Sequence, residues 1–395
     1  MRGFAAVASF AILLLTTGCG GGGDTTPTTG PNVQAITVDS GPTNNVNFLF
    51  TTVTICAPGS RSNCQSVDHV LVDTGSIGLR IISSLLSPSL LLRQQTDVNG
   101  NPVAECGQFA DGYTWGPVKV ADVNMSEEQA RAVPIQVIGD PAFSVVPASC
   151  SSIGPAENSV QTLGANGVLG VGVFQQDCGL ICAQSAIPGT YYICPSSGCQ
   201  ETQADLTQQL QNPIGMFSLD NNGVIIALPS VPFTGAVSVS GSMIFGIGTQ
   251  GNNALGNAQV MPVDQNTGTF ITRLNQLTYS NSFIDTGSNA LFFADASIAT
   301  CSGAASGFDC PASTLSLSAT NQGTSGAVSI VNFQVANADS LFSANPTFAA
   351  FGNLAGTNSD ATAFDWGLPF FFGRNVFVAI EGQNTPAGAG PYLAY

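Results

Sequence analysis

Short apolar runs, separated by segments rich in Gly, Ser and Asn, recur along most of the 395-residue chain. No long stretch follows the 3.6-residue period of an amphipathic helix, and the 45 glycines are spread through the whole sequence. Runs such as 70–72 and 283–284 have the length and apolar character of buried strands. The pattern therefore predicts a mainly β protein with short strands, many turns and few helices.

One tetrapeptide, Asp-Thr-Gly-Ser, occurs twice, at Asp73–Ser76 and Asp285–Ser288, and each copy directly follows one of these apolar runs. When the two copies are aligned, the apolar positions that flank them also align. A single Asp-Thr-Gly is ordinary turn chemistry. At average residue usage, two accidental copies in a chain of this length have odds of about one percent. We interpret the pair as an internal duplication.

Two strand-borne carboxylates of this kind predict a catalytic pair, Asp73 and Asp285. When two carboxylates lie close together they cannot both ionise easily, so the pair shares one proton. One group can then take a proton from water while the other protonates a carbonyl, which hydrolyses a peptide bond without a covalent intermediate. The neighbouring residues should support the pair, with glycines allowing close approach and hydroxyls donating hydrogen bonds. These supporting residues are Thr74, Gly75, Ser76, Thr286, Gly287 and Ser288.

Other chemistries fit the composition poorly. The only histidine is His69, so a Ser-His-Asp triad or a histidine-rich zinc site has too few residues. Neither tetrapeptide lies in an acidic, ligand-rich loop of the kind that holds Ca²⁺. With 8 Lys and Arg against 24 Asp and Glu, the formal net charge is −16, which argues against a nucleic-acid partner. We expect neither a metal nor a cofactor.

The N-terminus has the features of an export signal over residues 1–18: Arg2, an apolar stretch from Phe4 to Leu15 and a small-residue boundary. Cys19 follows Gly18 as in bacterial lipoprotein cleavage sites, where the cysteine becomes the lipidated first residue. A plain secretory signal is the alternative. Residues 19–45 are expected to be the lipidated cysteine and a flexible tether. The prediction is a protein of the cell envelope, anchored to a bacterial membrane through Cys19.

Without Cys19, ten cysteines remain, an even number that favours disulfides in an exported chain. Their spacing predicts the bridges Cys56–Cys64, Cys194–Cys199 and Cys301–Cys310. Four more cysteines should form two further bridges in a pairing that the sequence leaves open: Cys106, Cys150, Cys178 and Cys182. A zinc site built on Cys178 and Cys182 is a weaker alternative.

The residues at this point resemble the pepsin-like aspartic peptidases. Four further segments occur in that family's order: a β-hairpin flap at 109–116, a brace of the first catalytic loop at 166–172, the crossing to a second lobe at 217–219 and 241–249, and a second brace at 366–374. The resemblance implies a bilobal fold, with two β-barrel-like lobes at 46–230 and 231–395 and a cleft between them. The chain as a whole also resembles a set of bacterial lipoproteins that carry this pattern.

The resemblance implies an endopeptidase acting on a peptide or protein substrate. Because one chain carries both aspartates, a monomer suffices. Three residues depart from the family pattern. Phe109 stands at the flap Tyr, Arg80 stands at the Trp that packs on that Tyr, and Pro369 stands where the second brace usually has a Gly. Tyr113, four residues after Phe109, is the candidate substitute for the flap Tyr. Arg80 is expected in a structural ion pair or at a substrate anion. These departures motivate a second hypothesis, a non-catalytic module of the same fold that binds a peptide or protein partner.

Overall fold

The computed structural model describes residues 30–395. Strands make up 42% of the residues and helices 10%, so the prediction of a mainly β protein is confirmed. Two sheets account for nearly all the strands. The predicted export signal 1–18 and Cys19 lie outside the described residues. Within the described part of the chain, no helix is long and apolar enough to cross a membrane.

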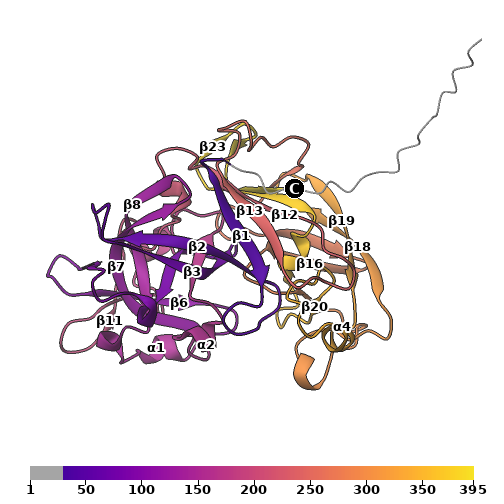
Figure 1. The fold of residues 1–395 in the computed structure, drawn as a ribbon, viewed down its shortest axis with the longest axis horizontal. Coiled ribbons are helices and arrows are strands. Elements are labelled where there is room, and N and C mark those ends of the chain that lie inside the picture. The colour runs from indigo at the N-terminus through magenta and orange to yellow at the C-terminus, as the bar shows by residue number, and fades with distance from the viewer. Residues whose placement is uncertain (1–29) are drawn as a thin grey trace, which may run out of the picture.

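The first sheet has sixteen strands and contains the first tetrapeptide (Figure 1). In spatial order, with β5 (Arg93–Gln94) paired to β7 beside this path, they are β11 (Gln200–Glu201), β10 (Tyr191–Ile193), β6 (Val103–Gln108), β7 (Tyr113–Met125), β8 (Glu128–Ile138), β4 (Ile77–Ile82), β9 (Gly167–Val171), β3 (Cys64–Asp73), β2 (Phe48–Cys56), β1 (Val33–Asp39), β13 (Val239–Phe245), β12 (Gly223–Leu228), β22 (Arg374–Ala379), β25 (Tyr392–Ala394) and β14 (Val260–Pro262).

Part of this sheet closes on itself. β7 pairs both with β8 and with β2, so the strands β2, β3, β9, β4, β8 and β7 form a closed ring. Fully buried residues such as Val53, Val72, Leu79, Ile135 and Leu169 fill it. A closed ring leaves no free strand edge and encloses one apolar core. Asp73 therefore stands at the end of a strand that is hydrogen-bonded to a neighbour on each side.

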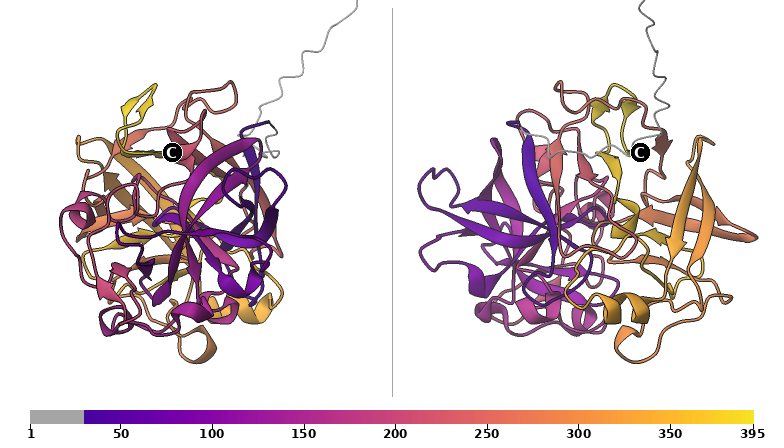
Figure 2. Two further views of the ribbon diagram at one scale, coloured as in Figure 1. Left: turned by 90° about the vertical axis from the view of Figure 1, so that its left-hand side faces the viewer. Right: turned by 45° about the vertical axis from the view of Figure 1, so that its right-hand side comes forward.

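The second sheet has seven strands and contains the second tetrapeptide. Figure 2 shows its outer strands on the opposite side of the molecule from the ring. A stack of aromatic rings packs on it, in which Phe364 lies 4.1 Å from Trp366 and 4.6 Å from Phe293 between ring centroids. In spatial order its strands are β19 (Val328–Val335), β18 (Leu315–Gln322), β15 (Phe270–Leu274), β16 (Leu277–Ile284), β21 (Phe364–Trp366), β17 (Leu291–Phe293) and β20 (Ala355–Gly356), and a separate pair is formed by β23 (Asn384–Thr385) and β24 (Gly388–Ala389).

The helices are short and lie in connections between strands, as the absence of a helical period predicts. The longest, α4 (Ala338–Ala344), begins at Asn337, whose side chain accepts a hydrogen bond from the Ser340 amide. The others are α1 (Ala148–Ser151), α2 (Val160–Leu163) and α3 (Leu180–Gln184), with 3-10 turns η1 (Ser83–Leu85), η2 (Pro141–Phe143), η3 (Ile214–Met216), η4 (Gly303–Ala305) and η5 (Leu368–Phe370).

The prediction that residues 19–45 form a flexible tether is wrong for residues 33–39. Residues 33–39 form β1, which pairs with β13 on one side and β2 on the other. Ile36 and Val38 are buried, and the residues on either side of each are at least partly exposed. This alternation of two residues is the one expected for a strand with one face on the core. The Gly, Thr and Pro composition of the preceding segment does not extend this far.

The internal duplication is visible in the strand register. In the first sheet β3 runs parallel to β9, with Leu71 opposite Val168. In the second sheet β16 runs parallel to β21, with Phe283 opposite Asp365. Leu71 and Phe283 are matched positions, because each stands just ahead of its tetrapeptide at the same distance from the aspartate. The antiparallel pairings match as well, since β4 pairs with β9 and β17 with β21. The two halves thus present their tetrapeptides in the same local architecture.

All ten cysteines of the described residues are paired. The three bridges predicted from spacing are confirmed, and the open pairing resolves to Cys106–Cys150 and Cys178–Cys182. The zinc alternative at Cys178 and Cys182 is therefore wrong, because both sulfurs belong to a disulfide. Cys106–Cys150 spans 44 residues and ties β6 to α1, whereas the other bridges close local loops.

We predict that removing the long bridge costs the most stability. On the chain-entropy account, C106A/C150A should lose about 4 kcal/mol of unfolding free energy and C178A/C182A about 2 kcal/mol, because the loops closed differ in length. Denaturant unfolding of the full chain measures both. Equal losses in the two double variants would contradict this account.

Candidate active site

The two tetrapeptides meet and exchange hydrogen bonds through their threonines. The Thr74 amide donates to Thr286 Oγ1 at 3.1 Å, and the Thr286 amide donates to Thr74 Oγ1 at 3.0 Å. Each hydroxyl then donates to the backbone of the opposite half, Thr74 to the Ile284 carbonyl at 3.1 Å and Thr286 to the Val72 carbonyl at 2.7 Å. Both threonines are buried. Every donor and acceptor of this junction is satisfied, so the two loops hold each other in a fixed position.

Each aspartate is oriented by its own loop. The Gly75 and Ser76 amides donate to Asp73 Oδ1 at 2.7 and 3.1 Å, and the Ser76 hydroxyl donates to Asp73 Oδ2. In the second loop the Gly287 amide donates to Asp285 Oδ1 at 2.7 Å and the Ser288 hydroxyl to Asp285 Oδ2 at 2.9 Å. The Gly75 amide also reaches Asp285 Oδ1 at 3.1 Å. All eight residues of the tetrapeptides therefore lie in one site.

The two glycines allow the carboxyl groups to approach. A Cβ atom added to Gly75 would lie 2.7 Å from Asp285 Cγ, and one added to Gly287 would lie 2.9 Å from Asp73 Cγ. Real side chains do not tolerate such contacts. The need for glycine comes from the opposite half of the molecule, because each glycine packs against the other loop's aspartate.

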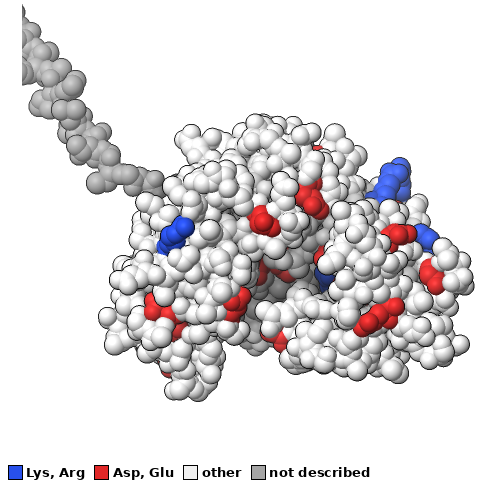
Figure 3. Space-filling model, turned by 180° about the vertical axis from the view of Figure 1, so that it is seen from behind, with Lys and Arg blue, Asp and Glu red and all other residues white. Residues whose placement is uncertain are grey.

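The site is acidic and open on one side. Asp73 is buried, whereas Gly75 is exposed and Asp285 is half-buried. Figure 3 shows a hollow near the middle of one face with acidic side chains inside it. Desolvation, then the charge of Asp73, then that of Asp365 raise the pKa of Asp285 well above its ordinary value. A carboxyl pair of this kind holds a proton in a range where isolated aspartates are ionised.

A third carboxyl group, Asp365, was missed by the sequence analysis. It lies in β21 between β16 and β17, and it is only 5% exposed. Burial raises the pKa of Asp365 to about 8; a hydrogen bond from the Ser288 side chain opposes this rise, and the charge of Asp73 adds a smaller one. In the sequence, Asp365 could have been found as a charged residue inside the otherwise apolar run 363–366. The brace predicted at 366–374 begins just after Asp365, so the aspartate fell outside every predicted segment.

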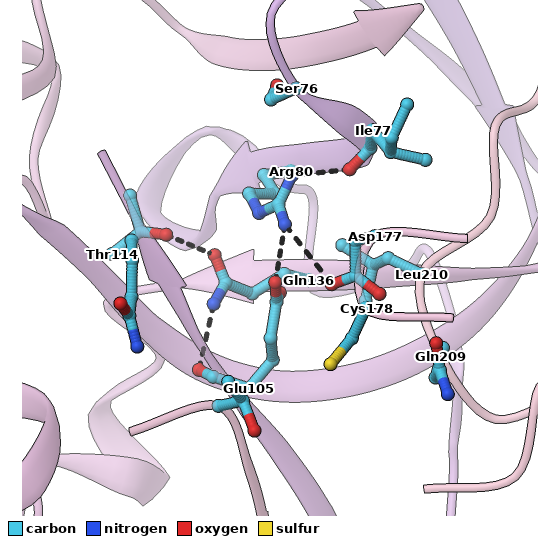
Figure 4. Close-up of polar contacts among 12 residues, drawn as sticks. Ser76, Ile77, Arg80, Glu105, Thr114, Gln136, Asp177, Cys178, Gln209 and Leu210 are labelled. Atoms are coloured by element: carbon cyan, nitrogen blue, oxygen red, sulfur yellow. Dashed lines mark hydrogen bonds and ion pairs between the residues drawn. The ribbon is translucent and has the colours of Figure 1, made fainter. Parts of the chain in front are cut away.

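Figure 4 shows Arg80 in a buried cluster, directed at Glu105 and Asp177. Its guanidinium contacts Glu105 Oε1 at 2.5 Å and Asp177 Oδ2 at 3.5 Å, and it donates to the Ile77 carbonyl at 2.8 Å. Burial and then the charge of Glu105 raise the pKa of Asp177 well above its ordinary value. The expected structural ion pair is thus present, and Arg80 is 4% exposed.

The predicted flap segment is a β-hairpin. β6 and β7 are antiparallel, and Gln108 opposite Tyr113 is the pair closest to the turn. Across the turn the Phe109 amide donates to the Gly112 carbonyl at 2.9 Å. Phe109 is half-buried, and its ring centroid lies 5.7 Å from the Arg80 guanidinium carbon. Tyr113 is buried among Trp115, Tyr192 and the Cys106–Cys150 bridge. Its side chain therefore contributes to a core rather than replacing the missing flap hydroxyl.

The strand register shows that Pro369 does not occupy the glycine position of the segment 366–374. Gly170 follows Leu169 in β9, and in the matching strand of the other half Gly367 follows Trp366. A Cβ added to Gly367 would lie 2.0 Å from the Ala290 carbonyl oxygen, and one added to Gly170 would lie 2.5 Å from the Ile77 amide. The second brace therefore keeps its glycine, two residues earlier than expected. Pro369 lies beyond it in η5 and is buried.

The described residues give no support for a metal centre. One group of potential ligands comes together, Cys301, Cys310 and Asp339. The two cysteines form a disulfide, so neither can supply the thiolate that binds metals. The hydrogen bonds that Asp73 and Asp285 accept come from backbone amides and serine hydroxyls.

We predict that a single methyl group disrupts the loop junction. Gly287→Ala should cost about 1 to 3 kcal/mol of unfolding free energy, because the methyl would press on the Asp73 carboxyl. Gly251→Ala is the matched control, since a Cβ added there meets no atom within 4 Å. Denaturant unfolding measures both variants, and equal stability of the two would show that the loops are not in close contact.

We also predict a large effect of breaking the Arg80 cluster. Arg80→Met leaves Glu105 and Asp177 buried without their cation, which should cost about 3 to 5 kcal/mol of unfolding free energy. Arg131→Gln, at an exposed arginine, should change it by less than about 0.5 kcal/mol. Adding Glu105→Gln to Arg80→Met should recover part of the loss. A full-sized loss in the double variant would show that packing, not charge, dominates the cluster.

A comparison with curated proteins finds no match. A family model described as "Protein of unknown function (DUF3443)" matches residues 28–395, which includes both tetrapeptides, the hairpin and β21. The chain therefore belongs to the DUF3443 family.

Proposed function

We propose that the protein is an aspartic endopeptidase of pepsin-like bilobal fold, in which Asp73 and Asp285 activate one water molecule. The observation that carries the proposal is the reciprocal junction of the two loops, with Thr74 and Thr286 exchanging amide and hydroxyl contacts between the halves. A chance pair of turns would have no reason to share such contacts. The duplicated register of β3 with β9 and of β16 with β21 supports the same fold.

The chemistry follows from the shared proton. The ionised carboxylate removes a proton from water, and the protonated one donates to the carbonyl oxygen of the peptide bond. The tetrahedral intermediate then collapses when a proton reaches the leaving amine, which returns the pair to its starting state. The raised pKa of Asp285, caused first by burial and then by the charge of Asp73, supports a pair that holds one proton. Backbone amides hold both carboxylates in place during these transfers.

The substrate is proposed to be an extended peptide that lies in the hollow of Figure 3. We propose that the β6–β7 hairpin covers it. Phe109 offers the substrate an apolar surface and no hydroxyl, so it cannot donate a hydrogen bond across the peptide. Arg80 packs against the Phe109 ring of the hairpin, and its side chain is too buried to meet a substrate anion. The acidic character of the molecule favours substrates without many carboxylates.

The proposed place of action is the cell envelope, with Cys19 lipidated and the folded domain outside the cytoplasm. Five disulfides among the described residues support an oxidising compartment. Both tetrapeptides come from one chain, so the proposed active form is a monomer. This part of the proposal predicts labelling of the wild-type chain by a palmitate precursor and loss of the label in Cys19→Ser.

The proposal predicts acid-dependent cleavage of a denatured protein by the full chain. Cleavage should occur between pH 3 and 7 and should stop with pepstatin. Asp73→Asn and Asp285→Asn should each abolish it, because an amide cannot share the proton of the pair. Asp339→Asn, at an exposed acid of α4, is the control that keeps activity.

Cleavage by Asp73→Asn or Asp285→Asn at the wild-type rate would overturn the proposal. Peptide and pepstatin binding by the wild-type chain, without cleavage at any of these pH values, would instead favour the non-catalytic binding module.

A further inference from the structure

The two halves of the site differ at one matched position. Val168 of the first half corresponds by strand register to Asp365 of the second, since they lie opposite the matched residues Leu71 and Phe283. Val168 is apolar and buried, so the Ser76 hydroxyl in the first loop has no third carboxyl beside it from this strand. Asp365 places an extra ionisable group on the Asp285 side alone.

Asp365 is buried without a cation. Its Oδ1 atom has no hydrogen-bond partner, and the residue is 5% exposed. Among the described residues, the ion pairs of Lys, Arg and His involve neither Asp365 nor Asp73 nor Asp285. A buried carboxylate with no positive partner is costly, whereas its protonated form is not.

Ser288 connects this group to the pair. Its hydroxyl donates to Asp285 Oδ2 at 2.9 Å, and the same side chain interacts with the Asp365 carboxyl. The groups that face Asp365 are therefore Ser288, Asp285 and Asp73. Arg80, in the strand that follows the first tetrapeptide, is directed at Glu105 and Asp177 (Figure 4).

We propose that Asp365 is a third acid of this site, and that its protonation is coupled to that of Asp285 through Ser288. The Ser288 hydroxyl has one proton, which it donates to Asp285 Oδ2 when Asp365 is protonated, whereas an ionised Asp365 competes with Asp285 for that proton. Asp365 is a positioning residue for the proton, acting through Ser288. The inference deepens the proposed function, because it sets the pH range over which the pair stays singly protonated.

Infrared difference spectra of the full chain test the titration directly, since protonated and ionised carboxyl groups absorb at different frequencies. The wild-type spectrum minus that of Asp365→Asn should contain one protonated carboxyl that disappears at a pH of about 8. Asp365→Val, which copies Val168, should give the same difference. Asp309→Asn is the control, because Asp309 is buried elsewhere with a pKa raised by burial to about 6.

Asp285→Asn provides the coupling measurement and does not rely on an Asp365 variant folding. Removing the charge of Asp285 should lower the pH at which Asp365 loses its proton by about one pH unit or more, because each of two coupled groups shifts the titration of the other. No band near neutral pH, or no shift in Asp285→Asn, overturns the inference.

Peptide cleavage separates this inference from the proposed function. If the wild-type chain cleaves peptide, the alkaline limb of its pH profile should move to lower pH in Asp365→Asn and Asp365→Val. If it cleaves nothing but the infrared result holds, the third acid stands and the proposed activity falls. An unchanged pH profile in both Asp365 variants overturns the third acid and leaves the peptidase in place.

Discussion

The exchange of hydrogen bonds between Thr74 and Thr286 is the contact on which the whole site depends. It joins a loop of the closed ring to a loop of the second sheet, and each threonine satisfies a buried amide of the other half. Only with this junction in place do the glycines face the opposite carboxyl groups. The carboxyl pair is therefore a property of the assembled molecule, and neither half contains it alone.

Burial then decides the charge state of the site. The molecule has few cations, and the one arginine near the first loop is committed to Glu105 and Asp177. Among the described residues Asp73, Asp285 and Asp365 have no positive partner, and burial raises the pKa of Asp285 and of Asp365. The same arginine packs against the ring of Phe109 and donates a hydrogen bond to the carbonyl of Ile77, the residue after Ser76. A single buried cluster thus links the hairpin to the first loop.

Much of this arrangement was predictable because the tetrapeptides, their flanks and the cysteine spacings are local signals. The strand character, the duplication and three disulfides were predicted from short segments whose chemistry is self-contained. Three features were not accessible in this way. β1 was missed because its apolar residues follow a tether-like segment, and Gly367 was missed because motif matching ignores strand register. Asp365 was missed because its strand neighbours, in β16 and β17, are distant from it in the sequence.

We propose that Asp73 and Asp285 share a proton and bind one water molecule between them. Neutron diffraction from crystals of the deuterated protein at acid pH measures this directly, because it locates both oxygen and deuterium. We expect one solvent oxygen within hydrogen-bond distance of both carboxyl groups and one deuterium shared by the pair. Two separately hydrated, fully ionised carboxylates, or a side chain filling the space between them, would contradict it.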